Sequence, residues 1–226
     1  MLLLVGCQRT DINERAKIIF GDSRQLQLIN VLARGNFSRA DYILKTLPID
    51  LPGTNGGTVL WWEACEKNFD GFEYLLRKGA DPNKLVSDEK NTMEYCAEAS
   101  DPRFLESILK YGGKVNLVGS FSGETPIAVA VMASNEANIE FLLRNGAELN
   151  FSDTQGDTPL SLSLLANHFD LAVFLLKRGA DPNKRNKAGL NAFDFLERWK
   201  RTPDHPLYPS YTNAVKAFEQ RKNQGK

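Results

Sequence analysis

Histidine, cysteine and net charge are all scarce in this chain of 226 residues. It contains two histidines and three cysteines, and its 28 basic residues balance its 28 acidic ones. A neutral chain lacks the general attraction to polyphosphate on which nucleic-acid binding depends, so we predict no nucleic-acid partner. With 42% hydrophobic and 25% charged residues the chain can bury a core, and its length suits one or two domains.

The charge is nevertheless distributed unevenly along the chain. Residues 1–175 carry 16 basic and 23 acidic side chains, whereas residues 176–226 carry 12 and 5. We interpret the basic C-terminal part as a solvated cap that keeps the protein soluble, although such a charge could also steer an acidic partner.

Residues that could carry out catalysis or bind a metal are equally sparse. The two histidines, His168 and His205, have no evident titratable partner in the sequence. Residues 119–123 have the glycine spacing of a hydrolase nucleophile elbow, but the central residue is Phe121 instead of serine. Residues 53–57 are glycine-rich without the Gly-Lys-Ser/Thr of a phosphate-binding loop. We therefore predict that the protein is not an enzyme and holds no cofactor or metal.

The strongest pattern in the sequence is a repeat of about 33 residues. The hexapeptide Gly-Ala-Asp-Pro-Asn-Lys occurs at residues 79–84 and again, unchanged, at residues 179–184, and related segments begin at Gly112 and Gly146. Threonines recur with the same period at Thr58, Thr92, Thr125 and Thr158. Because two independent markers share one period, the sequence indicates an array of stacked units.

The unit that begins at Thr158 predicts a pair of helices. Thr158 is placed to cap the first helix and Pro159 to occupy its first turn, where the missing N–H of proline costs nothing. Asn167 and His168 interrupt the apolar pattern, which then resumes at helical spacing until Gly179, a residue suited to a left-handed helix end. Such a helix pair is too small to bury its apolar face alone, so neighbouring units must pack together.

These residues resemble the ankyrin-repeat family, whose units combine Gly-x-Thr-Pro-Leu, two helices and Leu-Leu-x-x-Gly-Ala-Asp-x-Asn. The match extends over residues 56–184 and is weakest in the third unit, where Asp101 and Pro102 are expected to break the turn. The resemblance implies an all-α solenoid of about five to six stacked helix-turn-helix units with exposed hairpin loops. We place the ankyrin-repeat array at residues 21–202, with a degenerate first unit, and a C-terminal loop and capping helix at residues 203–226.

The repeat register also predicts which residues enter the core. Leu143 and Leu175, on the second helices of interior units, are expected to be buried. Cys65 and Cys96 fall at non-equivalent positions of neighbouring units and outside any metal-binding spacing, so we expect small core residues instead of a disulfide. Residues 211–224 are expected to form the closing helix.

The N-terminus resembles a bacterial lipoprotein signal. Residues 1–7 are apolar up to Cys7, and residues 4–7 (Leu-Val-Gly-Cys) are similar to a lipobox, in which signal peptidase cuts before a lipidated cysteine. Six residues precede Cys7 and none is basic, so either the signal begins further upstream or the match is chance and the apolar end packs on the first helix. We predict a truncated signal at residues 1–7, a tether at residues 8–20 and, because Gln8 follows the cysteine, an outer-membrane anchor.

Function is expected on the surface of the array. In ankyrin-like stacks the hairpin tips and the first helix of each pair line a groove that binds other proteins, and aromatic side chains in such a patch are typical interface anchors. The apolar candidates lie on first helices or at loop tips, although one of two adjacent tryptophans must face the neighbouring unit. They are Trp61, Trp62, Leu85, Tyr95, Val118, Phe121, Met132, Phe151 and Leu165.

The lipobox and the array together resemble the ankyrin-repeat immunity lipoproteins that bacteria tether in the periplasm to neutralise phospholipases delivered by type VI secretion. This resemblance implies an antitoxin that binds a toxic effector enzyme one to one and reaches the membrane only through a lipid on Cys7. The alternative is a periplasmic ankyrin scaffold or envelope-stress protein that is not linked to a toxin. A toxin gene next to the gene of this chain would favour the first interpretation.

Overall fold

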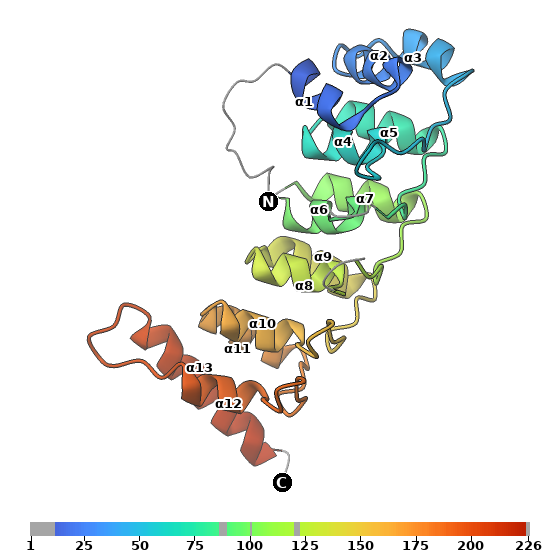
Figure 1. Ribbon diagram of the computed structural model, residues 1–226. Coiled ribbons are helices and arrows are strands. Elements are labelled where there is room, and N and C mark those ends of the chain that lie inside the picture. The colour runs from blue at the N-terminus through green and yellow to red at the C-terminus, as the bar shows by residue number, and fades with distance from the viewer. Residues whose placement is uncertain (1–11, 86–89, 100, 120–122, 225–226) are drawn as a thin grey trace. The chain divides into compact units, whose positions relative to one another are not determined.

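The computed structural model describes residues 12–85, 90–99, 101–119 and 123–224, and all regular structure in these ranges is helical (Figure 1). The chain divides into two compact units, residues 1–92 and residues 93–226. Each unit is built from helix pairs, as the repeat predicts.

The first unit contains five helices: α1 (Ile12–Ile19), α2 (Ser23–Leu32), α3 (Phe37–Leu44), α4 (Val59–Cys65) and α5 (Phe69–Arg77). Helix α1 corrects the expectation of a tether at residues 8–20, of which residues 8–11 lie outside the described part. Ala16, Ile19 and Phe20 are at most 4% exposed, so this segment belongs to the core of the unit. The sequence pattern missed it because one short helix carries no trace of the repeat.

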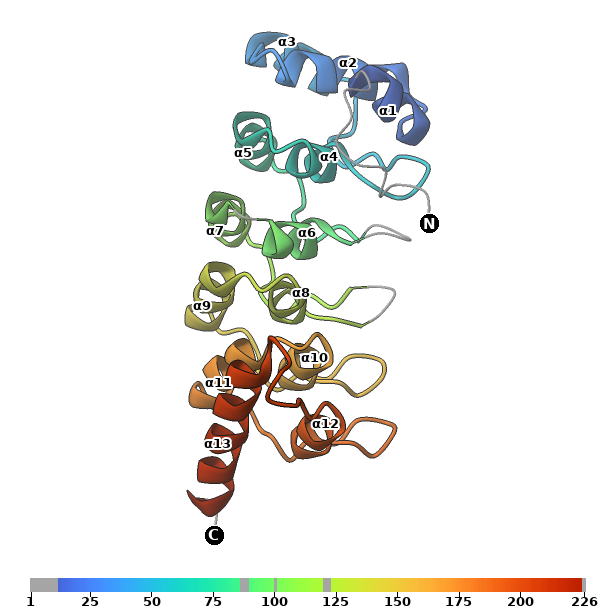
Figure 2. The ribbon, with the colours of Figure 1, turned by 90° about the vertical axis from the view of Figure 1, so that its left-hand side faces the viewer.

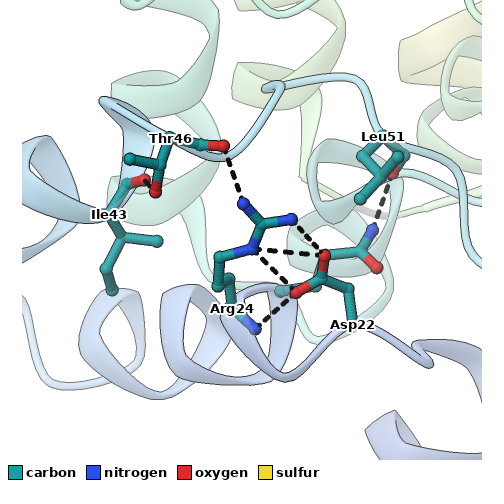
Figure 3. Close-up of polar contacts among 6 residues, drawn as sticks. Asp22, Arg24, Ile43, Thr46 and Leu51 are labelled. Carbon is teal, nitrogen blue, oxygen red and sulfur yellow. Dashed lines mark hydrogen bonds and ion pairs between the residues drawn. The ribbon is translucent and has the colours of Figure 1, made fainter.

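Polar contacts fix the first helix pair of this unit (Figure 3). Asp22 caps α2, since its carboxylate accepts the backbone N–H of Arg24 at 2.8 Å and also pairs with the Arg24 guanidinium. The same guanidinium donates to the carbonyl of Thr46, just beyond α3, at 2.8 Å. Gln25, which is 1% exposed, donates to the carbonyl of Leu51 at 2.7 Å. These bonds tie the loop after α3 back onto α2 and give partners to two backbone carbonyls of that loop.

The second unit contains α6 (Thr92–Glu98), α7 (Pro102–Lys110), α8 (Pro126–Met132), α9 (Glu136–Arg144), α10 (Pro159–Leu165), α11 (Phe169–Lys177), α12 (Ala192–Arg198) and α13 (Tyr208–Gln224). Within this unit α8 packs on α9 and α10 on α11, and α10 also packs against both α8 and α12 (Figures 1 and 2). The first helices of successive pairs are therefore direct neighbours.

The pair α10–α11 forms for the reasons that the sequence gives. The Thr158 hydroxyl accepts the N–H of Ser161 at 3.2 Å, and the Ser161 hydroxyl accepts the N–H of Thr158 at 2.8 Å, which completes a capping box. Pro159 stands in the first turn. Asn167 adopts a left-handed φ of 60° between the helices, and Gly179 ends α11 with a φ of 96°. The helix pair predicted for this unit is confirmed.

In the third repeat, which contains α6 and α7, the structure differs from the sequence prediction. Asp101 and Pro102 do not disrupt the turn between α6 and α7: they begin α7. The Asp101 carboxylate accepts the N–H of Arg103 at 3.0 Å, and Pro102 occupies the first turn. An N-cap followed by proline is a favourable helix start, so this departure from the family pattern keeps the helix pair.

The predicted closing helix is present and begins three residues earlier than expected, at Tyr208. Helix α13 lies on α11 and α12 (Figure 2), with Tyr211 and Phe218 at most 7% exposed. Tyr211 meets the edge of Phe169 at a centroid distance of 5.5 Å, and Phe218 meets Phe193 at 5.6 Å. A long helix thus takes the place of a regular second helix at the C-terminal end of this unit.

The prediction of two buried leucines on second helices was right for one residue and wrong for the other. Leu175 is 0% exposed, as predicted, but Leu143 is only half-buried, and Leu142 is the residue that is 0% exposed in α9. Leu142 precedes Leu175 by 33 residues and is therefore its true equivalent. The prediction for Leu143 was wrong by one residue, which turns a side chain by about 100° around a helix. Cys96 is buried and Cys65 half-buried.

Candidate protein-binding surface

Histidines do not form a reactive centre in the described part of the chain. His168 occupies the N-cap position of α11 without a side-chain capping bond, and its Nδ1 lies 2.6 Å from the Ser134 hydroxyl. His205 Nδ1 accepts the N–H of Leu207 at 3.1 Å. No cluster of His, Cys, Asp or Glu in the described ranges could hold a metal ion. None of the helices described here has the length and apolarity needed to span a membrane.

The two tryptophans of α4 belong to the core of the first unit. Trp61 is 6% exposed and donates its indole N–H to the carbonyl of Lys90 at 2.9 Å. Trp62 is 3% exposed, meets Phe20 edge to face at 5.8 Å, and has the Arg15 guanidinium 5.8 Å from its ring centroid. The expectation of an exposed tryptophan anchor was wrong, because α4 is buried on all sides from Val59 to Ala64.

The four loop candidates and Tyr95, which lies on α6, differ from one another in exposure. Leu85 is 47% exposed in the first unit and Val118 is 37% exposed in the second. Phe151 and Tyr95 are half-buried, so each presents only part of its side chain. Phe121 lies outside the described residues. Of these five predictions, Leu85 and Val118 have the exposure that a partner would require.

Met132 and Leu165 are exposed apolar residues of the second unit. They are the last residues of α8 and α10, and 49% and 37% of their side chains are exposed. They occupy the same position of the repeat, and their helices pack against each other. The next residue in this series is Arg198, the last residue of α12, which is also exposed. The repeat period could have identified Arg198, although the search for apolar residues passed over it.

The first unit exposes two apolar residues that the sequence analysis missed. Ile18 on α1 is 73% exposed, and Tyr42 on α3 is 61% exposed. The Tyr42 ring has the Arg39 guanidinium 4.8 Å and the Lys45 ammonium 5.9 Å from its centroid. Cations at these distances from an aromatic ring are attracted to it by cation–π interactions.

A buried acid is the strongest electrostatic feature of the first unit. Glu63 on α4 is 2% exposed, and its carboxylate accepts a hydrogen bond from the Asn68 side-chain amide at 2.5 Å. Burial raises the pKa of Glu63 to about 8, and this shift outweighs the opposing effect of the Asn68 hydrogen bond. The other repeat units place Ala97, Ala130 and Ser163 at this position. A glutamate at a position where these repeats carry a small residue is the signal by which the sequence could have revealed the buried acid.

Comparison with known proteins places this geometry in a known architecture. Residues 93–186 match the family described as ankyrin repeats in three copies. The crystal structure of EF0377, an ankyrin repeat protein, superposes with a TM-score of 0.69 at 21% identity, covering 85% of this chain and 96% of that one. The chain therefore has an all-helical ankyrin-repeat fold, and the repeats imply a protein-binding module.

Sequence relatives match shorter stretches. Protein PhlB of Serratia liquefaciens is 34% identical over 96 residues, which are 42% of this chain and 42% of PhlB. An IkB-like protein of African swine fever virus is 25% identical over 128 residues, 52% of this chain and 54% of the viral protein. The chain thus spans about half the length of the curated relatives that it matches.

Proposed function

We propose that this chain is an immunity lipoprotein that neutralises a phospholipase effector of type VI secretion by binding it in the periplasm. The observation that carries the binding role is the pair of exposed apolar side chains, Met132 and Leu165, at one repeated position of packed helices. The lipobox-like residues 4–7 support the periplasmic, outer-membrane location, and they lie outside the described part of the chain.

Inhibition would be stoichiometric. A helical array is rigid before it meets its partner, so it loses little conformational entropy on binding and can hold a wide surface in place. Covering the face through which a phospholipase reaches lipid would stop the enzyme without any chemistry by the inhibitor. Such a role requires no catalytic group on this chain.

The first test is direct. We expect a phospholipase effector gene beside the gene of this chain, and its product, mixed with the purified protein, should form a one-to-one complex by light scattering after size exclusion. Co-expression in the periplasm should restore growth to cells that the effector otherwise kills. Growth arrest that persists despite equal expression of both proteins, or the absence of any adjacent effector gene, would refute the antitoxin role and leave the scaffold interpretation.

Lipidation of Cys7 is tested by replacing it with serine, which cannot carry the thioether-linked lipid. Because a multiply acylated cysteine anchors a protein durably, we expect the wild-type chain in the outer-membrane fraction. Cys7→Ser should move it to the soluble periplasmic fraction, as judged by immunoblotting of fractionated cells. Cys65→Ser, which removes an unrelated thiol, serves as the control. An identical distribution of wild type and Cys7→Ser would contradict the anchor.

A further inference from the structure

We infer that the exposed ends of α8, α10 and α12 bind an extended acidic segment of a partner protein, with apolar side chains of that segment on Met132 and Leu165 and its carboxylates on Arg198 and Lys200. We call these four residues the end row. The inference deepens the proposed function, since it names the chemistry of the partner at one surface. It is carried by position, exposure and charge within the second unit alone.

The end row is a regular surface. Met132, Leu165 and Arg198 are spaced by 33 residues and end three helices of which α10 packs against both others. Axes of packed helices lie about 8–10 Å apart, so equivalent side chains recur at roughly that interval. A segment in the extended polyproline II conformation rises about 3.1 Å per residue and has three residues per turn, so every third side chain lies on the same face and would meet the next helix end.

The row changes from apolar to cationic along its length. Ala133 and Ala166, next to Met132 and Leu165, are also exposed and enlarge the apolar part. Arg198 and Lys200 follow at the end of α12, and both are exposed. Such a surface is complementary to a segment with apolar residues opposite α8 and α10 and acidic residues opposite α12. A basic residue opposite α12 would be repelled by Arg198 and Lys200.

The two cations are available to a partner. Neither side chain forms an ion pair or a hydrogen bond with any residue in the described ranges, in contrast to Arg185, which pairs with Asp194 at 3.0 Å. Arg198 and Lys200 are therefore exposed cations whose side chains can pair with the carboxylates of a partner.

The test uses a defined peptide and the intact chain. The peptide carries leucine at its third and sixth positions and glutamate at its ninth and tenth, in a glycine and serine background. The protein is labelled with carbon-13 in its methionine methyl groups. Titration should shift the signal of Met132, which is 49% exposed, and leave that of Met93, which is 0% exposed, unchanged.

Two variants locate the contacts. The double variant Arg198→Glu with Lys200→Glu should lower the affinity for the peptide roughly threefold to tenfold, because each exposed ion pair contributes only modestly to binding. Lys216→Glu, a charge reversal on the exposed side of α13, should leave affinity unchanged. A peptide with lysine in place of glutamate should bind more weakly than the original by a similar factor.

The inference is overturned if the Met132 signal does not shift at peptide concentrations up to the millimolar range. It is also overturned if the double charge reversal and the lysine peptide both leave the affinity unchanged. These outcomes are separate from those of the antitoxin test. If the effector binds one to one while the peptide fails, the proposed function stands and the end row is not its site. If the peptide binds as expected while no effector does, the surface stands and the antitoxin role falls.

Discussion

Replacing Leu175 with alanine should lower the free energy of unfolding by about 2–5 kcal/mol, the range for truncating a buried leucine and leaving a cavity. Leu175 is 0% exposed on α11, in an interior helix pair whose neighbours cannot easily move inward. Urea unfolding followed by far-ultraviolet circular dichroism measures the change. In a repeat array the loss of one unit also weakens the coupling to its neighbours.

Leu143→Ala is the matched control, since it makes the same chemical change at a half-buried site of α9. It should cost clearly less than Leu175→Ala because less apolar area returns to water on unfolding. Equal losses for the two variants would contradict the register described for the second helices, and a loss below about 1 kcal/mol at Leu175 would contradict its burial.

The free energy of unfolding of the first unit should fall as the pH rises from 5 to 8, and Glu63→Gln should remove most of this fall. The folded chain holds the Glu63 proton up to a pKa of about 8, whereas the unfolded chain releases it near the ordinary value of 4.5. Between these values the unfolded state binds fewer protons, so stability falls as pH rises. At about 1.4 kcal/mol per unit of pKa shift, the loss is on the order of 4 kcal/mol by pH 8.

The measurement is the free energy of unfolding of both proteins at intervals from pH 5 to pH 8. Glutamine retains an oxygen that can accept from Asn68 and resembles the protonated acid, so the variants should match near pH 5 and the glutamine variant should be the more stable near pH 8. Asp70→Asn, at an exposed position of α5, controls for the loss of one acid. A constant difference between wild type and Glu63→Gln at every pH would show that Glu63 is ionised in the folded chain.

Local chemistry explains which parts of the fold the sequence predicted. Thr158, Pro159 and Gly179 act through the adjacent backbone, and such signals can be recognised in a linear string. Helix α1 could not be recognised in this way, because its place in the core depends on contacts made after the chain has folded. The same limit explains Asp101, whose capping role needed the geometry of α7.

The surface was harder to predict than the core. Trp62 and Met132 both lie on first helices, and a sequence of seven helical residues does not reveal that one is 3% and the other 49% exposed. Burial depends on which neighbours cover each helix, and α4 is covered where the end of α8 is not. The periodicity supplied equivalent positions, while exposure at those positions had to come from the structure.

Helix α13 limits how the array can be lengthened. Repeat units contact only their neighbours, so an array can in principle grow at either end. In residues 93–226 that route is closed at the C-terminal side, because α13 covers α11 and α12 and buries Ala214 and Phe218 against them. At this side the unit could be lengthened only by adding whole repeats before α13, where the period of 33 residues keeps each cap and loop in register.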